Sequence, residues 1–128
     1  MEDTRQDIRE LLEGLKDRFN MLAPIMLQMG IIDDLLYRKI IITERGAASY
    51  TIAITPEGMS VEDGADLFSH AVMCTTRDEW HKILTGRKTY AAIFRFDLEP
   101  QRDVVPLKDM ALVERFSSVM QAMVLLKL

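Results

Sequence analysis

The chain has 128 residues, of which 48% are apolar and 28% are charged, a balance typical of a soluble globular domain and unlike that of a disordered segment. A chain of this length fits one domain with one hydrophobic core. The formal net charge is -4, and no run of Lys and Arg interleaved with aromatic residues occurs, so composition argues against nucleic-acid binding.

Cysteine content and hydropathy indicate the compartment. Cys74 is the one cysteine, which excludes an intrachain disulfide and favours a reducing environment. The first residues lack the basic start and apolar core of a signal peptide. The longest apolar stretch, residues 21–36, is interrupted by polar residues and is too short to span a membrane. We therefore expect a cytoplasmic protein whose contact with membranes is transient at most.

The N-terminal region predicts an amphipathic helix, because its apolar residues recur at intervals of three and four. These residues are Ile8, Leu11, Leu12, Leu15, Phe19 and Leu22. Pro24 predicts a break, followed by a short second helix that ends before Gly30. Two roles stay open for this region: a cover over a sheet, or a pocket wall to which Met21, Met26 and Met29 contribute.

The pattern then changes to strands. Residues 40–42 are β-branched, residues 44–47 form a turn, and residues 50–55 alternate between apolar and polar, which together predict a hairpin. Glycine and proline punctuate a third short strand at residues 59–62, and residues 67–74 predict a fourth. We expect these four strands to follow one another as an antiparallel meander.

Thr76 begins a well-specified helix. Its hydroxyl can accept a hydrogen bond from the backbone of Glu79 while that carboxylate reaches back, and Gly86 provides the left-handed conformation that ends the helix. The apolar side of this helix carries Trp80, Ile83 and Leu84.

Three further elements are expected after this helix. Thr89 can begin a short helix that runs to Phe94, and residues 96–104 alternate loosely around Pro100, which predicts an edge or irregular strand. Pro106 then opens a long final helix. The apolar positions of that helix are Leu112, Val113, Phe116, Val119, Met120, Met123 and Val124.

Residues capable of catalysis or metal binding are few and dispersed. His70 and Cys74 lie four apart in an expected strand, hence about 13 Å from each other, which is too far to share a metal. His81 has no second ligand at helical spacing. We therefore expect no metal, no cofactor and no catalytic residue.

The stretch from Tyr50 to Asp103 resembles the sterol carrier protein 2 family of lipid-binding domains. The resemblance lies in the order and ungapped spacing of two strands, the capped helix ending at Gly86, the segment Thr89-Tyr-Ala-Ala-Ile-Phe94 and an extended run that ends at Arg102-Asp103. It extends over residues 37–123. The chain departs from the family pattern at Phe96 and Arg102, which stand where family members carry glycine.

The resemblance implies an α+β fold, in which a five-stranded, mostly antiparallel sheet carries helices on one face. Residues 1–128 would form a single domain, with a helical N-terminal extension over residues 1–36 and the family core over residues 37–123. An apolar tunnel between sheet and helices would hold the ligand. The lining residues implied by position are Ile52, Ile54, Trp80, Ile83, Leu84, Tyr90, Ile93, Phe94, Phe116, Met120 and Met123.

Three hypotheses for function follow. The favoured one is non-enzymatic binding or transfer of an apolar lipid of sterol, fatty acyl or isoprenoid type, which nine adaptable methionines also suit. The alternative is a regulatory or dimerising interaction module, a homodimer included, in which the same apolar groove is filled by a partner. The third is an enzyme that acts on an apolar substrate through Cys74 or His81.

Overall fold

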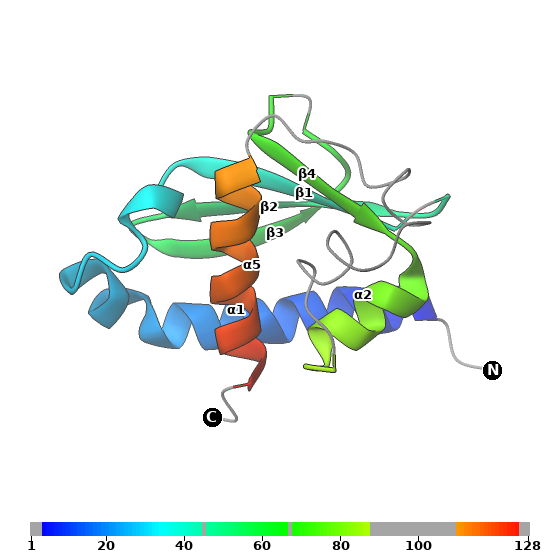
Figure 1. Ribbon diagram of the computed structural model, residues 1–128, viewed down its shortest axis with the longest axis horizontal. Helices are drawn as coiled ribbons and strands as arrows, with labels where there is room; N and C mark the ends of the chain where they lie inside the picture. Colours follow the sequence, from blue (N-terminus) through cyan, green and yellow to red (C-terminus); the bar gives the residue numbers. More distant parts are fainter. Residues whose placement is uncertain (1–3, 45, 67, 88–109, 126–128) are drawn as a thin grey trace.

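The computed structural model describes residues 4–44, 46–66, 68–87 and 110–125. The elements in chain order are α1 (Thr4–Gln28), the 3-10 helix η1 (Asp33–Leu35), β1 (Arg38–Glu44), β2 (Ser49–Thr55), β3 (Gly58–Asp63), β4 (Ala71–Thr75), α2 (Arg77–Leu84) and α5 (Met110–Leu125). The architecture is α+β, with the helices on one side of the sheet (Figure 1). The short helix expected at residues 89–94 and the strand expected at residues 96–104 lie outside the described residues.

The sheet has the strand order β3-β2-β1-β4. The hairpin and the third strand are confirmed, since β2 pairs antiparallel with both β1 and β3. The expected antiparallel meander is wrong at its fourth strand, because β4 lies beside β1 and runs parallel to it. Within the described residues the sheet is therefore mixed and four-stranded, in place of the five mostly antiparallel strands that were expected.

The segment between β3 and β4 explains this topology, because it crosses the face of the sheet opposite the helices. The Thr51 hydroxyl donates to the carbonyl of Gly64 (2.7 Å) and accepts from the backbone N–H of Asp66 (3.1 Å), while the Lys39 ammonium pairs with the Asp66 carboxylate at 2.7 Å. The backbone N–H of His70 then donates to the carbonyl of Lys39 (2.8 Å). These contacts deliver the chain to the far side of β1 in the same direction as β1.

Among the described residues, one hydrophobic core lies between the inner face of the sheet and the helices α1, α2 and α5. Alternation along β1 and β2 directs Ile40, Ile42, Ile52 and Ile54 to this face, where all four are fully buried. In Figure 1, α1 runs beneath the sheet and α5 crosses α1. The apolar side of α1 completes the core with Ile8, Leu12, Leu15 and Phe19.

Helix α1 continues through Pro24, so the expected break there is wrong. An internal proline costs a helix about 3 kcal/mol, and core burial of Ala23 and Met26 on either side of it offsets this cost. One turn earlier, the side chain of Asn20 ties α1 to the start of β3. Its amide donates to the carbonyl of Met59 (3.1 Å), and its Oδ1 accepts from the backbone N–H of Met59 (2.6 Å).

Candidate ligand-binding site

The inner face of the sheet and helix α5 bring five of the residues that were expected to line the ligand site into one cluster. Phe116, Met120 and Met123 follow one another at intervals of four and three, which places them on one face of α5. All three are buried, together with Ile52 and Ile54 of β2, in the same core. These five expected residues therefore belong to one buried core.

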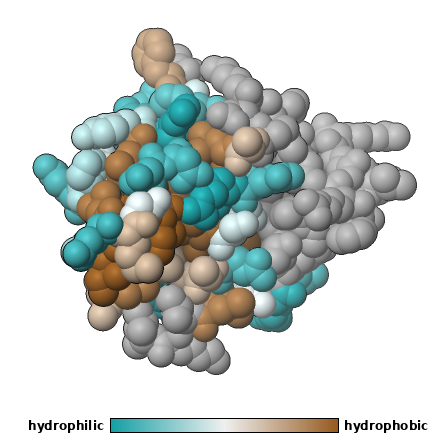
Figure 2. Space-filling view, turned by 60° about the vertical axis from the view of Figure 1, so that its left-hand side comes forward, coloured by the Kyte–Doolittle hydropathy of each residue, from teal (hydrophilic) through white to brown (hydrophobic). Residues whose placement is uncertain are grey.

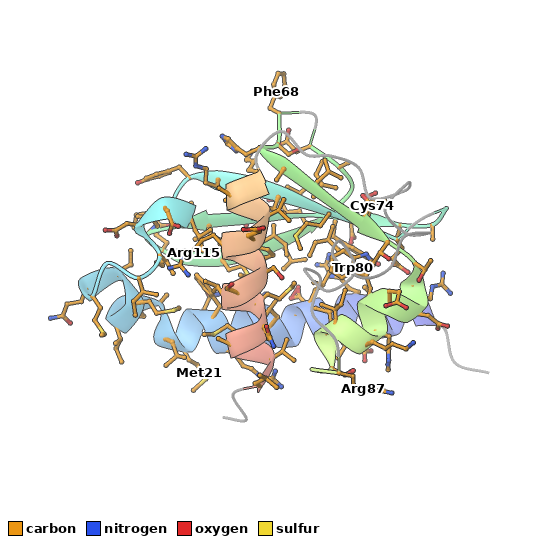
Figure 3. The ribbon with its side chains drawn as sticks, in the orientation of Figure 1. Met21, Phe68, Cys74, Trp80, Arg87 and Arg115 are labelled. Carbon is orange, nitrogen blue, oxygen red and sulfur yellow. The ribbon has the colours of Figure 1, made fainter. Side chains whose placement is uncertain are left out.

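Helix α2 adds the next three expected residues. Trp80, Ile83 and Leu84 are buried in the same core. The indole N–H of Trp80 donates to the carbonyl of Thr43 at 2.8 Å, which fixes the ring against the end of β1 (Figure 3). Tyr90, Ile93 and Phe94, the remaining three, lie outside the described residues, as do Phe96 and Arg102.

The ends of α2 are those predicted from the sequence, and they set the position of the Trp80 ring. The hydroxyl of Thr76 accepts from the backbone N–H of Glu79 at 3.2 Å. At the other end Gly86 has a φ of 84°, and its N–H donates to the carbonyl of Ile83 at 3.2 Å. The N–H of Arg87 donates to the carbonyl of residue 82 at 2.9 Å, which completes the Schellman pattern of a helix C-terminus.

A buried polar network closes the end of the core beside Trp80. Glu44 is 0% exposed; one carboxylate oxygen accepts from Nε of Arg77 at 3.0 Å, and the other accepts from the hydroxyl of Tyr50 at 3.2 Å. Burial, helped by the negative charge of Glu44, raises the pKa of Tyr50 to about 12. Thr75, aligned with Glu44 across β1 and β4, keeps a buried hydroxyl with no hydrogen-bond partner among the described residues.

Sequence analysis missed this network because Glu44 stands next to a turn, where a carboxylate is ordinarily solvated. The contact with Arg77 joins residues from β1 and α2 that the sequence pattern does not link. The network is an ion pair between Arg77 and Glu44 with a second hydrogen bond from the Tyr50 hydroxyl. It connects α2 to the sheet at the same end as the hydrogen bond of Trp80.

His70 and Cys74, beside and on β4, are not members of the hydrophobic core cluster. The imidazole Nδ1 of His70 accepts from the backbone N–H of Lys39 at 3.1 Å, a contact that extends the pairing of β1 and β4. Cys74 is buried on β4. Across the described ranges, His, Cys, Asp and Glu side chains form no group of three or more that could hold a metal ion. No described helix is both long enough and apolar enough to cross a bilayer.

An exposed apolar stripe formed by Met21, Ile25 and Met29 runs along the second half of α1 and the residue just after its end. Their spacing of four places them on one face of the helix, where they are 67%, 56% and 68% exposed. Figure 2 shows apolar side chains gathered on this side of the molecule. Of the three methionines considered above for a pocket wall, Met26 alone faces the core.

Comparison with known proteins addresses the fold. No protein-family model matches the sequence. No curated protein matches it either. Among solved structures, one described as a UbiJ-SCP2 ubiquinone synthesis protein superposes with a TM-score of 0.61, over 87% of this chain and 88% of that chain, at 13% sequence identity. The chain therefore has a sterol carrier protein 2-like fold, as the order of its predicted elements indicates.

Proposed function

We propose that this domain binds an apolar lipid of sterol, fatty acyl or isoprenoid type between β2 and the helices α2 and α5, without catalysis. The observation that carries the proposal is the buried core that Trp80, Phe116 and Met120 share with Ile52 and Ile54 of β2, in a fold shared with a lipid-carrier type of domain. That the similar structure is a ubiquinone synthesis protein favours an isoprenoid cargo among the three classes. The proposal assigns no reaction to Cys74 or His81.

The energetics of such binding come from the hydrocarbon chain. Each methylene removed from water contributes about 0.8 kcal/mol, so a chain of roughly 16 carbons offers about 12 kcal/mol before any cost. Loss of translational and rotational freedom and ordering of the chain remove several of these, which leaves an affinity near micromolar. Met120 and Met123 suit this role because unbranched thioethers adapt to differently shaped aliphatic ligands.

The first test is extraction of freshly purified protein with organic solvent and identification of the released molecules by mass spectrometry. A stoichiometric lipid supports the proposal and identifies the cargo class. The second test uses Trp80, the one tryptophan of the chain, whose fluorescence reports directly on the expected site. Titration with a fatty acid and with an isoprenoid alcohol should change this fluorescence saturably. Empty protein with no response to either ligand would contradict the proposal.

A matched pair of variants on α5 locates the ligand. Met120→Gln places an amide of similar length in the buried cluster, where its desolvation opposes an apolar ligand, and we expect affinity to fall about tenfold or more. Ala122→Gln introduces the same side chain on the exposed face of α5 and should leave affinity unchanged. Circular dichroism of both variants confirms that the fold is retained. Equal affinities of the two variants would exclude this side of α5.

The exposed stripe of Met21, Ile25 and Met29 favours a second candidate function, the dimerising module. If two copies pair through this stripe, sedimentation should show a dimer that Ile25→Asp converts to monomer. Ser60→Asp, exposed on the face of β3 opposite the helices, is the control for the added charge. A monomer at every concentration, without bound lipid, would contradict both candidate functions.

A further inference from the structure

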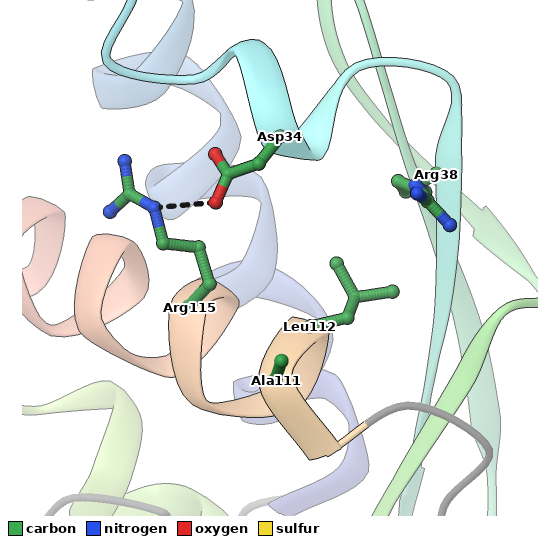
Figure 4. A pocket seen from close by; sticks show the side chains of 5 residues that line it. All are labelled: Asp34, Arg38, Ala111, Leu112 and Arg115. Atoms are coloured by element: carbon green, nitrogen blue, oxygen red, sulfur yellow. Dashed lines mark hydrogen bonds and ion pairs between the residues drawn. The ribbon is translucent and has the colours of Figure 1, made fainter.

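A hollow of about 150 Å³ lies where η1, the start of β1 and the first turn of α5 meet (Figure 4). Its lining residues are Asp34, Arg38, Ala111, Leu112 and Arg115. Its volume is below the 300–1,000 Å³ or so of a pocket that encloses a whole organic ligand, so it suits a small polar group.

Of the three charged residues that line the hollow, Asp34 and Arg115 form an ion pair and Arg38 does not take part in it. Nε of Arg115 pairs with Oδ2 of Asp34 at 2.9 Å, and the same guanidinium donates to the carbonyl of Ile31. Arg38 lies across the hollow from this pair (Figure 4), and no hydrogen bond or ion pair engages its guanidinium within the described part of the chain. Because Asp34 and Arg115 neutralise each other, the hollow presents the net positive charge of Arg38.

One lining residue of the hollow is also part of the apolar core. Leu112 lines the hollow, yet it belongs to the core cluster and is only 5% exposed. Phe116 follows it one turn later on α5, in the lipid site proposed above. The positively charged hollow therefore borders the apolar core at Leu112 of α5.

We propose that this hollow binds the anionic head group, a carboxylate or a phosphate, of a lipid whose chain passes over Leu112 toward Phe116. The inference rests on the proposed function and adds to it the chemistry of the head group. Arg38 donates to the anion because a guanidinium presents several N–H donors in a planar fork that matches carboxylate and phosphate oxygens. Arg115, held by Asp34, forms the opposite wall.

The test compares dodecanoate with dodecan-1-ol, which share a chain and differ in the charge of the head group. Binding to the full chain is followed through the fluorescence of Trp80. A charge-assisted hydrogen bond to a partly exposed arginine corresponds to roughly a tenfold change in affinity. We therefore expect the acid to bind roughly tenfold more tightly than the alcohol, and Arg38→Gln to abolish this difference by weakening the acid alone.

Two controls accompany Arg38→Gln. Arg38→Lys retains the charge and should preserve part of the preference for the acid. Arg87→Gln removes an exposed arginine at the end of α2, away from Arg115 (Figure 3), and should preserve all of it.

The outcomes separate the head-group assignment from the lipid proposal. If Arg38→Gln leaves the ratio of acid to alcohol affinity unchanged while both ligands bind, the assignment to this hollow is overturned and the lipid site stands. If neither ligand binds, the lipid proposal fails and the head-group assignment fails with it. Displacement of dodecanoate by millimolar inorganic phosphate would identify a site for free anions and overturn the role of the chain.

Discussion

Gly58, at the start of β3, gives the sharpest test of how α1 is held to the sheet. Its φ of 129° is a conformation that L-residues with side chains rarely adopt, and a Cβ placed there would lie 2.3 Å from Oδ1 of Asn20. Gly58→Ala therefore introduces backbone strain of about 2 kcal/mol. It also displaces the Asn20 amide from Met59, which leaves a backbone N–H unpaired at a further cost of about 1–3 kcal/mol. We expect a total loss of about 4 kcal/mol in the free energy of unfolding.

The assay is urea unfolding followed through Trp80, arranged as a double-mutant cycle with Asn20→Ala. In the Asn20→Ala background the steric conflict is gone, so Gly58→Ala should cost only the backbone term of about 2 kcal/mol. Gly46→Ala is the matched control, because Gly46 has a φ of 74° and no heavy atom within 4 Å of the added Cβ. An equal cost of Gly58→Ala in both backgrounds, or a cost no larger than that of Gly46→Ala, would refute the coupling.

Further predictions concern the polar network and α1. The pKa of Tyr50 is raised to about 12 from an ordinary value near 10, so its contribution of about 3 kcal/mol to the free energy of unfolding is complete below pH 10 and is lost as the pH rises to 12. Urea unfolding across this range should show a steeper alkaline loss for wild type than for Tyr50→Phe, and parallel curves would contradict it. Arg77→Met should lower the free energy of unfolding by about 2 kcal/mol in the same assay, because it leaves the buried carboxylate of Glu44 with Tyr50 as its remaining partner. Adding Glu44→Gln should recover part of this loss. Full stability of the single variant would argue against a buried ion pair. Gly14→Ala should stabilise the protein by about 0.5–1 kcal/mol, because Ala favours the helix more than Gly does and no neighbour outside the helix lies within 4 Å of the added Cβ. The measurement is a rise in the thermal midpoint of unfolding. A fall in that midpoint would show that the added methyl group is crowded.

Features set by neighbouring residues were predictable from the sequence. Thr76, Glu79 and Gly86 specify the two ends of α2 through short-range hydrogen bonds and backbone conformation, and the alternation of residues 50–55 specifies a strand with one buried face. These patterns depend on atoms a few residues apart, so tertiary structure changes them little.

Features set by distant residues were not predictable. Residues 67–74 were predicted to form a strand, and β4 occupies Ala71–Thr75. The sequence carries no information about which edge of the sheet this strand joins, and the contacts that decide this involve Lys39 and Thr51. Pro24 predicts a break in the helix, but α1 continues through it, because the core burial that offsets the cost of the proline cannot be read from local sequence. In the same way Arg38 and Arg115 line one hollow only after α5 has packed against η1, so no local pattern indicates this hollow.

The contact between the first and last helices has a consequence for the order of folding. The guanidinium of Arg18 lies within 3.4 Å and 3.5 Å of the carbonyls of Met123 and Val124, and Phe19 shares a core with Phe116. During synthesis α1 leaves the ribosome long before α5 exists, so β3 and α2 can cover α1 first, while the part of its apolar side that faces α5 stays exposed until α5 has been made. Contacts between segments so distant in sequence slow folding and prolong exposure of apolar surface. A nascent chain stalled before α5 is therefore the state of this protein in greatest need of a chaperone.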